Sequence, residues 1–121
     1  MIRSLFVYGT LRRGDMRWHF LEPFIVDDGA DDTVTGSLYD TGLDYPAAVF
    51  DGGGTIVGTT YELHHERIGE ALRILDEVEG AVEGLYRRVQ VTTGAGARAW
   101  AYAYGDGLEL TRIDSGDWFV R

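Results

Sequence analysis

The chain has 121 residues, of which 45% are hydrophobic and 26% are charged, a balance typical of an ordinary globular protein. Its formal charge of −9 argues against a nucleic-acid partner and an anionic membrane surface, and the absence of lysine excludes a phosphate-binding lysine loop and Schiff-base chemistry. There is no cysteine, so disulfides, thiolate metal sites and a cysteine nucleophile are also excluded.

The N-terminal half predicts β-strands separated by glycine-rich turns. The apolar run Leu5–Tyr8 predicts a buried strand, and the two glycines in residues 9–14 predict a tight loop directly after it. The acidic run Asp27–Asp32 is interpreted as a solvated turn. Further strands are predicted over Val34–Tyr39 and Ile56–Leu63, with a loop over residues 42–49 between them.

The C-terminal half predicts one helix and a hairpin. Residues Glu66–Glu79 have a clear helical period, whereas residues 85–93 and 98–104 flank a Gly-Ala-Gly turn and are expected to pair. The expected fold class is therefore α+β: a mixed, barrel-like β-sheet with one main helix, in a single domain over residues 1–121. The N-terminal apolar run is too short for a signal peptide and no apolar stretch approaches ~18 residues, so a cytoplasmic location is expected.

One carboxylate breaks the pattern of the predicted helix. On a helical wheel with Ile68 at 0°, Leu72 falls at about 40° and Glu79 at about 20°, inside the apolar stripe. Burial would raise the pKa of the Glu79 carboxyl and suit it to acid/base chemistry near neutral pH. The alternative is that Gly80 ends the helix and the Glu79 side chain turns out to solvent.

The loop after the first strand is the second candidate feature. Backbone N–H groups at a tight turn can bind an oxyanion or a carboxylate, and Gly9 allows close approach because it lacks a Cβ atom. The pattern Gly-x-x-x-x-Gly without a following lysine is also that of an ordinary turn, so the residues alone leave both interpretations open.

Several segments together resemble the gamma-glutamylcyclotransferase-like family. The motif Tyr8-Gly9-Thr10-Leu11-Arg12-Arg13-Gly14 is similar to the family's first motif, and Leu75-Asp76-Glu77-Val78-Glu79-Gly80 followed by Leu85-Tyr86-Arg87-Arg88 is similar to its second. Residues 36–40, 45–47 and 115–118 also resemble family segments. The Tyr-Gly-Thr-Leu form of the loop most resembles the gamma-glutamylamine cyclotransferase branch and its bacterial relatives.

The resemblance implies an enzyme that releases 5-oxoproline from a γ-glutamyl amine or related amide without a cofactor or metal. It implies that Glu79 is the catalytic acid/base and that the main chain of Tyr8, Gly9, Thr10 and Leu11 binds the substrate. Tyr86 is a further candidate for substrate binding because it follows Glu79 closely in the sequence, so its hydroxyl group could orient the carboxylate or the substrate. Packing in the core is the plainer interpretation of this residue.

Two other functions remain open at this stage. The chain could be a non-catalytic member of the same fold that binds a small amino acid-like ligand, or an interaction protein that recruits a basic partner through its acidic surface. The expected partner is a small molecule with a γ-glutamyl group; the sequence does not predict the amine leaving group or an oligomeric state.

Overall fold

The computed structural model describes residues 2–43, 45–80, 86–105 and 109–121. These residues form eight β-strands and two α-helices, which confirms the predicted α+β class with one main helix. The strands and helices are β1 (Ser4–Val7), α1 (Trp18–Leu21), β2 (Ala30–Thr35), β3 (Ser37–Asp40), β4 (Pro46–Val49), β5 (Thr55–Glu62), α2 (Ile68–Val78), β6 (Tyr86–Thr92), β7 (Arg98–Tyr104) and β8 (Thr111–Arg112). No helix among the described residues is long and apolar enough to cross a membrane.

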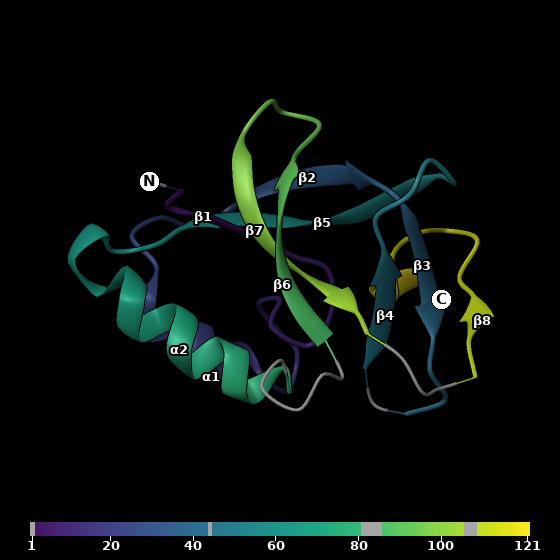
Figure 1. Ribbon diagram of the computed structural model, residues 1–121, viewed down its shortest axis with the longest axis horizontal. Coiled ribbons are helices and arrows are strands. Elements are labelled where there is room, and N and C mark those ends of the chain that lie inside the picture. The colour runs from purple at the N-terminus through teal and green to yellow at the C-terminus, as the bar shows by residue number, and fades with distance from the viewer. Residues whose placement is uncertain (1, 44, 81–85, 106–108) are drawn as a thin grey trace.

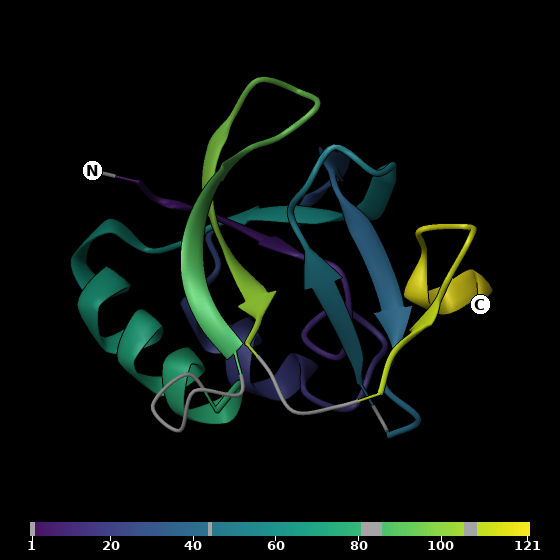
Figure 2. The same cartoon turned by 45° about the vertical axis from the view of Figure 1, so that its right-hand side comes forward.

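The strands belong to two sheets that together give the fold a barrel-like but open shape (Figure 1). The larger sheet has the order β2-β5-β1-β7-β6, in which β1 runs antiparallel to β5 and parallel to β7. The smaller sheet has the order β4-β3-β8. Figure 2 shows the smaller sheet on the side of the molecule away from α2, and the hydrogen bonds between described strands do not close the two sheets into one barrel.

Strand β1 lies between two hydrophobic cores, because its successive side chains point to opposite faces of the sheet. Leu5 and Val7 belong to the core under the helices, whereas Phe6 and the following Tyr8 belong to the core beneath the smaller sheet. The end of β1 and the loop after it are therefore held by packing on both sides. That position explains why the apolar run in the sequence has no polar alternation.

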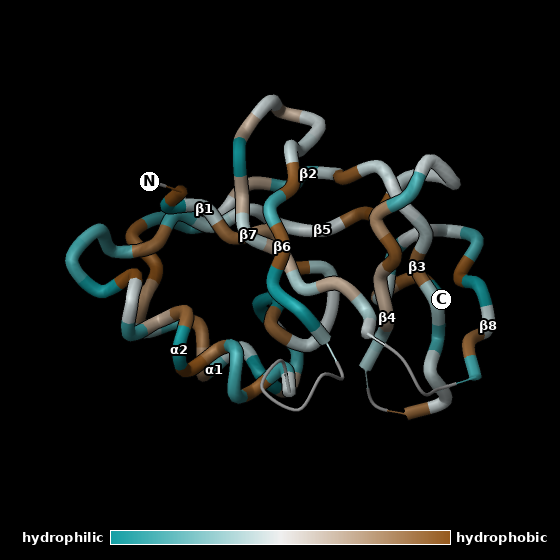
Figure 3. Tube along the Cα trace, in the orientation of Figure 1, coloured by the Kyte–Doolittle hydropathy of each residue, from teal (hydrophilic) through white to brown (hydrophobic). Residues whose placement is uncertain are grey.

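Helix α2 covers the first of these cores with its apolar stripe. Ile68, Ala71, Leu72 and Leu75 are buried, and hydrophobic and hydrophilic residues alternate along this part of the chain (Figure 3). The helix ends at Val78, and Gly80, two residues later, has a φ of 71° and donates its N–H to the Glu77 carbonyl. A left-handed glycine after the last helical turn is a frequent way to end a helix.

Three sequence predictions differ from the structure. The strand predicted over residues 34–39 is two strands, β2 and β3, separated at Gly36, and Pro46–Val49 forms strand β4 rather than part of a loop. The acidic run is only partly a turn, because Asp32 lies within β2 and is buried. Strand β4 has no alternating pattern because its first three residues are buried and it is only four residues long. The predicted strand over residues 85–93 begins at Leu85, which lies outside the described residues.

Candidate active site

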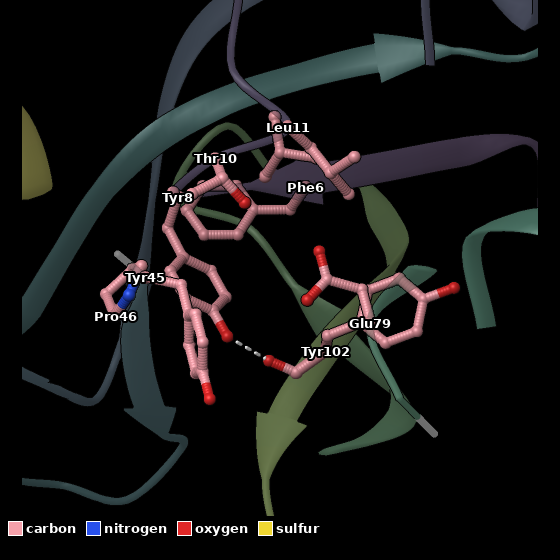
Figure 4. A pocket seen from close by; sticks show the side chains of 10 residues that line it. Phe6, Tyr8, Thr10, Leu11, Tyr45, Pro46, Glu79 and Tyr102 are labelled. Carbon is pink, nitrogen blue, oxygen red and sulfur yellow. Dashed lines mark hydrogen bonds between the residues drawn. The ribbon is translucent and has the colours of Figure 1, made fainter. Parts of the chain in front are cut away.

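A small pocket opens at the point where β1 ends, the end of α2 approaches and β4 begins (Figure 4). Its cavity has a volume of about 20 Å³, enough for about one ordered water molecule. It is lined by Phe6, Val7, Tyr8, Gly9, Thr10, Leu11, Tyr45, Pro46, Glu79 and Tyr102. The structure therefore brings together Glu79 and the whole Tyr8–Leu11 segment, although about seventy positions separate them along the sequence.

Glu79 reaches the pocket from the last turn of α2. Its N–H still donates to the Leu75 carbonyl at 2.9 Å, so the backbone holds the residue in helical position while its carboxylate points into the pocket (Figure 4). Among the described residues, no side chain or main-chain group forms a hydrogen bond or an ion pair with this carboxylate. The alternative in which Glu79 turns out to solvent is wrong.

The electrostatic surroundings of Glu79 favour its neutral form. Burial raises the pKa of the Glu79 carboxyl from 4.5 to about 7, and the positive charge of Arg17 acts in the opposite direction and lowers it. The residue as a whole is only half-buried, but the pKa depends on the surroundings of the carboxylate atoms, which face the pocket. A carboxyl with this pKa can accept and return a proton near neutral pH.

The loop Gly9–Leu11 forms a tight turn against β4. A Cβ atom on Gly9 would lie 2.6 Å from Cγ and 2.7 Å from Cδ of Pro46, so only glycine allows the loop to approach β4 this closely. The turn is held by hydrogen bonds from the Arg12 N–H to the Gly9 carbonyl and from the Arg17 N–H to the Thr10 carbonyl, both at 2.9 Å.

The polar groups of this loop are available to a ligand. Within the described part of the chain, the N–H groups of Gly9, Thr10 and Leu11 donate no hydrogen bond, and the Thr10 hydroxyl makes none either. The Thr10 side chain lines the pocket. Uncommitted donors at a pocket wall are the groups that can stabilise an oxyanion.

Tyr8 contributes to the pocket wall with its ring, while its hydroxyl is occupied. The hydroxyl donates to the Tyr102 carbonyl at 2.5 Å, which links the end of β1 to β7 (Figure 4). Burial, and next the negative charge of Glu79, raise the pKa of the Tyr8 hydroxyl well above its ordinary value. Tyr8 therefore stays neutral and acts as a structural donor.

Tyr86 lies behind the pocket rather than on its surface. Its hydroxyl donates to the Pro46 carbonyl at 2.6 Å, so it holds the β4 residue that packs against Gly9. Burial, followed by the charge of Glu79, raises the pKa of this hydroxyl as well. The structure thus connects Tyr86 to the pocket through Pro46.

A polar network supports the pocket from behind. Asp76, one helical turn before Glu79, accepts hydrogen bonds from Arg88 Nε at 2.9 Å and from the Tyr102 hydroxyl at 2.7 Å. Arg88 also stacks over the Trp100 ring at 4.3 Å. Of the alternating aromatic side chains of β7, only Tyr102 is among the residues that line this pocket, and neither Arg87 nor Arg88 is.

Sequence reasoning alone did not assign a role to Tyr45, Pro46 or Arg17. Tyr45 and Pro46 were recognised only as part of a family segment. The signal that could have indicated Pro46 is Gly9 itself, because a glycine in a tight loop often marks a place where another residue packs closely against the main chain. Arg17 has no sequence signal, because its proximity to Glu79 arises from the turn of residues 9–17. In the described part of the chain, no three His, Asp or Glu side chains are grouped as metal ligands.

The α+β fold and its pocket place the chain in the class of small proteins with a gamma-glutamylcyclotransferase-like fold. Residues 5–120 match the model of the family described as "Gamma-glutamyl cyclotransferase, AIG2-like", and the chain belongs to this family of enzymes.

Relatives of known sequence and structure agree with this assignment. The chain is 36% identical to a Vibrio cholerae protein named "Putative gamma-glutamylcyclotransferase", over all of this chain and 99% of that protein. It is 34% identical to the gamma-L-glutamyl-butirosin B gamma-glutamyl cyclotransferase of Niallia circulans, over 95% of this chain and 74% of that enzyme. The crystal structure of an uncharacterized Pyrococcus horikoshii protein superposes with a TM-score of 0.75 at 28% identity, over 98% of this chain and 90% of that one.

Proposed function

We propose that the protein releases 5-oxoproline from a γ-glutamyl amine or a related γ-glutamyl amide, with Glu79 as the acid/base. The observation that carries the proposal is the Glu79 carboxylate, which faces the Tyr8–Leu11 loop without a bonding partner among the described residues. Its pKa of about 7 matches the task of moving a proton both ways near neutral pH.

The proposed reaction is an intramolecular acyl transfer. Glu79 accepts a proton from the substrate's α-amine as the amine nitrogen attacks the γ-carbonyl carbon and forms the new N–C bond of a five-membered ring. The negative charge on the carbonyl oxygen is stabilised by N–H groups of Gly9 to Leu11. Glu79 then returns the proton to the leaving nitrogen as the original amide C–N bond breaks, so no water is consumed.

The enzyme's main contribution in this proposal is positioning. Ring closure within one molecule can have a very high effective concentration when the reacting atoms are held at the correct distance. A γ-glutamyl group is larger than the present cavity, so the bound substrate would extend through the pocket opening or displace side chains of its wall. Tyr86 is proposed to support this wall by holding Pro46, and thus to affect substrate binding indirectly.

The direct test measures 5-oxoproline release from a panel of γ-glutamyl amines and amides. We expect Glu79→Gln to lose turnover by a factor of about 10² or more while it still binds the substrate. The exposed neighbour Glu77 provides the matched control, and Glu77→Gln should keep the wild-type rate. Wild-type turnover by Glu79→Gln would refute the assignment, and binding without turnover by the wild-type protein would favour the non-catalytic ligand-binding function.

The extent of the family match also supports a proposal about domain organisation. Because residues 5–120 match one family model, we propose that residues 1–121 form a single domain. Limited proteolysis that leaves the chain intact until global unfolding would support this, whereas two separately stable fragments would contradict it.

A further inference from the structure

Arg17 lies beside the pocket, next to its lining residue Tyr45, although it was not a candidate in the sequence. Its backbone is fixed to the loop by the hydrogen bond from its N–H to the Thr10 carbonyl, at 2.9 Å. Its guanidinium carbon lies 5.8 Å from the centre of the Tyr45 ring, and Tyr45 lines the pocket. The side chain therefore extends from the loop toward the same pocket that Glu79 enters.

The positive charge of Arg17 has no carboxylate partner within the described residues. Five of the 11 arginines form ion pairs with described carboxylates, and Arg17 is among those that do not. Within the described part of the chain, the guanidinium makes one hydrogen bond, a weak contact with the Met16 sulfur at 3.6 Å. Arg17 is nevertheless close enough to Glu79 for its charge to act on that carboxyl.

An unpaired cation and an unpaired carboxylate beside one small pocket match a ligand with both charges. The head of a γ-glutamyl group has this form, because its α-amine and its α-carboxylate are attached to the same carbon atom. When the amine faces Glu79, the carboxylate must lie within a few ångströms of it. Arginine is the side chain best suited to bind a carboxylate, since its planar donors can make two parallel hydrogen bonds.

We propose that Arg17 binds the α-carboxylate of the γ-glutamyl group and so orients the α-amine toward Glu79. This inference rests on the proposed function and adds a specificity-determining residue to it. The N–H groups of Gly9 to Leu11, which donate to no described residue, then remain for the γ-carbonyl oxygen. The pocket thus separates the two negative groups of the reaction: a permanent carboxylate at Arg17 and a transient oxyanion at the loop.

The first test measures binding and does not need turnover. Titration calorimetry with 5-oxo-L-proline and with its carboxamide compares a ligand that has the carboxylate with one that lacks it. We expect the wild-type protein to prefer the carboxylate about ten- to hundredfold, as for other charge-assisted hydrogen bonds. Arg17→Gln should reduce this preference to near one, and Arg17→Lys should retain part of it because lysine keeps the charge but not the fork geometry.

Arg73→Gln is the matched control. Arg73 is an exposed arginine of α2 whose contact with Glu77 is 3.6 Å long, so the variant removes the same charge without changing the pocket. It should keep the full preference. Circular dichroism and the thermal midpoint confirm that each variant is folded. An unchanged carboxylate preference in folded Arg17→Gln, or no preference in the wild-type protein, overturns the proposal.

The second test uses turnover and distinguishes the two ends of the substrate. For a γ-glutamyl amide with an uncharged leaving amine, replacement of the α-carboxylate by a carboxamide should raise KM at least tenfold in the wild type and have little effect in Arg17→Gln. If Arg17→Gln weakens only substrates whose leaving amine carries a carboxylate, the proposal is overturned. If no γ-glutamyl compound is turned over by the wild type, the proposed function fails, while the binding test still decides the role of Arg17.

Discussion

Arg12 in the loop after β1 forms an ion pair at 2.8 Å with Asp117, which lies next to the last short helix of the chain. The two side chains are only 11% and 18% exposed, and the Arg12 guanidinium also stacks over the Phe119 ring at 4.0 Å. Asp117 accepts a second hydrogen bond from the Phe119 N–H at 2.9 Å. The C-terminal segment, residues 115–121, is thus part of the support of the candidate active-site loop.

Asp117→Asn should therefore destabilise the protein and loosen the loop. Removal of one partner leaves the other charge buried without compensation, which typically costs about 3 kcal/mol of unfolding free energy. We expect urea denaturation to show this loss and steady-state kinetics to show a higher KM. Arg13→Gln is the control, since the Arg13 contact with Asp28 is 4.0 Å long and exposed, and its loss should cost less than about 0.5 kcal/mol. Equal effects of the two variants would show that the Arg12–Asp117 pair has no special role.

Gly9→Ala should harm both stability and activity. The added methyl group would overlap with the Pro46 ring, and overpacking of this kind costs about 1–3 kcal/mol. The loop would have to move away from β4, and this would displace the main chain of Gly9 to Leu11 that lines the pocket. Gly69→Ala in α2 is the matched control, because a Cβ atom there meets no atom within 4 Å. That substitution should raise the unfolding free energy by about 0.5–1 kcal/mol through helix propensity.

Glu79→Gln should stabilise the folded protein at alkaline pH. The folded-state pKa of Glu79 is raised to about 7 from 4.5. Below pH 4.5 the carboxyl is protonated in both states and does not affect the free energy of unfolding. As pH rises from 4.5 through 7, the unfolded state loses this proton more easily than the folded state, so the free energy of unfolding falls. The neutral amide avoids this loss, which is at most about 3 kcal/mol above pH 7.

Denaturation curves of the Glu79→Gln and wild-type proteins at pH 4.5 and pH 8 measure this effect. The two proteins should differ little at the lower pH, and the variant should be more stable at the higher pH. Glu77→Gln serves as the exposed control with no such pH dependence. A wild-type protein that is as stable as Glu79→Gln at pH 8 would show that the carboxylate is well solvated.

The pH dependence of kcat/KM should have an acid limb near pH 7. The charged or titratable groups that interact with Glu79 are Arg17 before α1, Tyr8 after β1, Tyr86 of β6 and Tyr102 of β7. Burial raises the pKa of all three tyrosines, so they stay neutral in this range and the limb belongs to Glu79. Because Arg17 lowers the pKa of Glu79, Arg17→Gln should move the limb to higher pH. An unmoved limb would mean that another group controls the reaction.

Tyr86→Phe tests whether this hydroxyl acts through Pro46. The variant loses the 2.6 Å hydrogen bond and leaves the Pro46 carbonyl without this donor, which should cost about 1–3 kcal/mol of unfolding free energy. If Tyr86 only supports the wall, KM rises moderately while kcat and the acid limb of the pH profile are unchanged. A large loss of kcat in a stable variant would instead indicate direct contact with the reacting atoms.

The sequence was sufficient to predict the elements whose side chains follow a simple period. The α2 stripe of Ile68, Leu72 and Leu75 identified both the helix and the carboxylate that interrupts it. The apolar run before Gly9 identified β1 as a buried strand, because a strand that is covered on both faces has apolar residues at successive positions. Strand β4 has no such pattern, and it was recognised only when its pairing with β3 was known.

The arrangement of the site was decided by contacts between distant residues. The wheel placed Glu79 on the buried side of α2, but whether a described residue bonds to its carboxylate depends on β1, β4 and β7 as well as on the helix. The glycine at position 9 is visible in the sequence, whereas the proline ring that makes it necessary is 37 positions away. The sequence thus determined the family, the main elements and the unusual carboxylate, because these follow from motifs and local periodicity. Only the tertiary structure decided which polar groups near this carboxylate have a hydrogen-bond partner among the described residues, since those partners come from strands and a helix end that are far apart in the sequence.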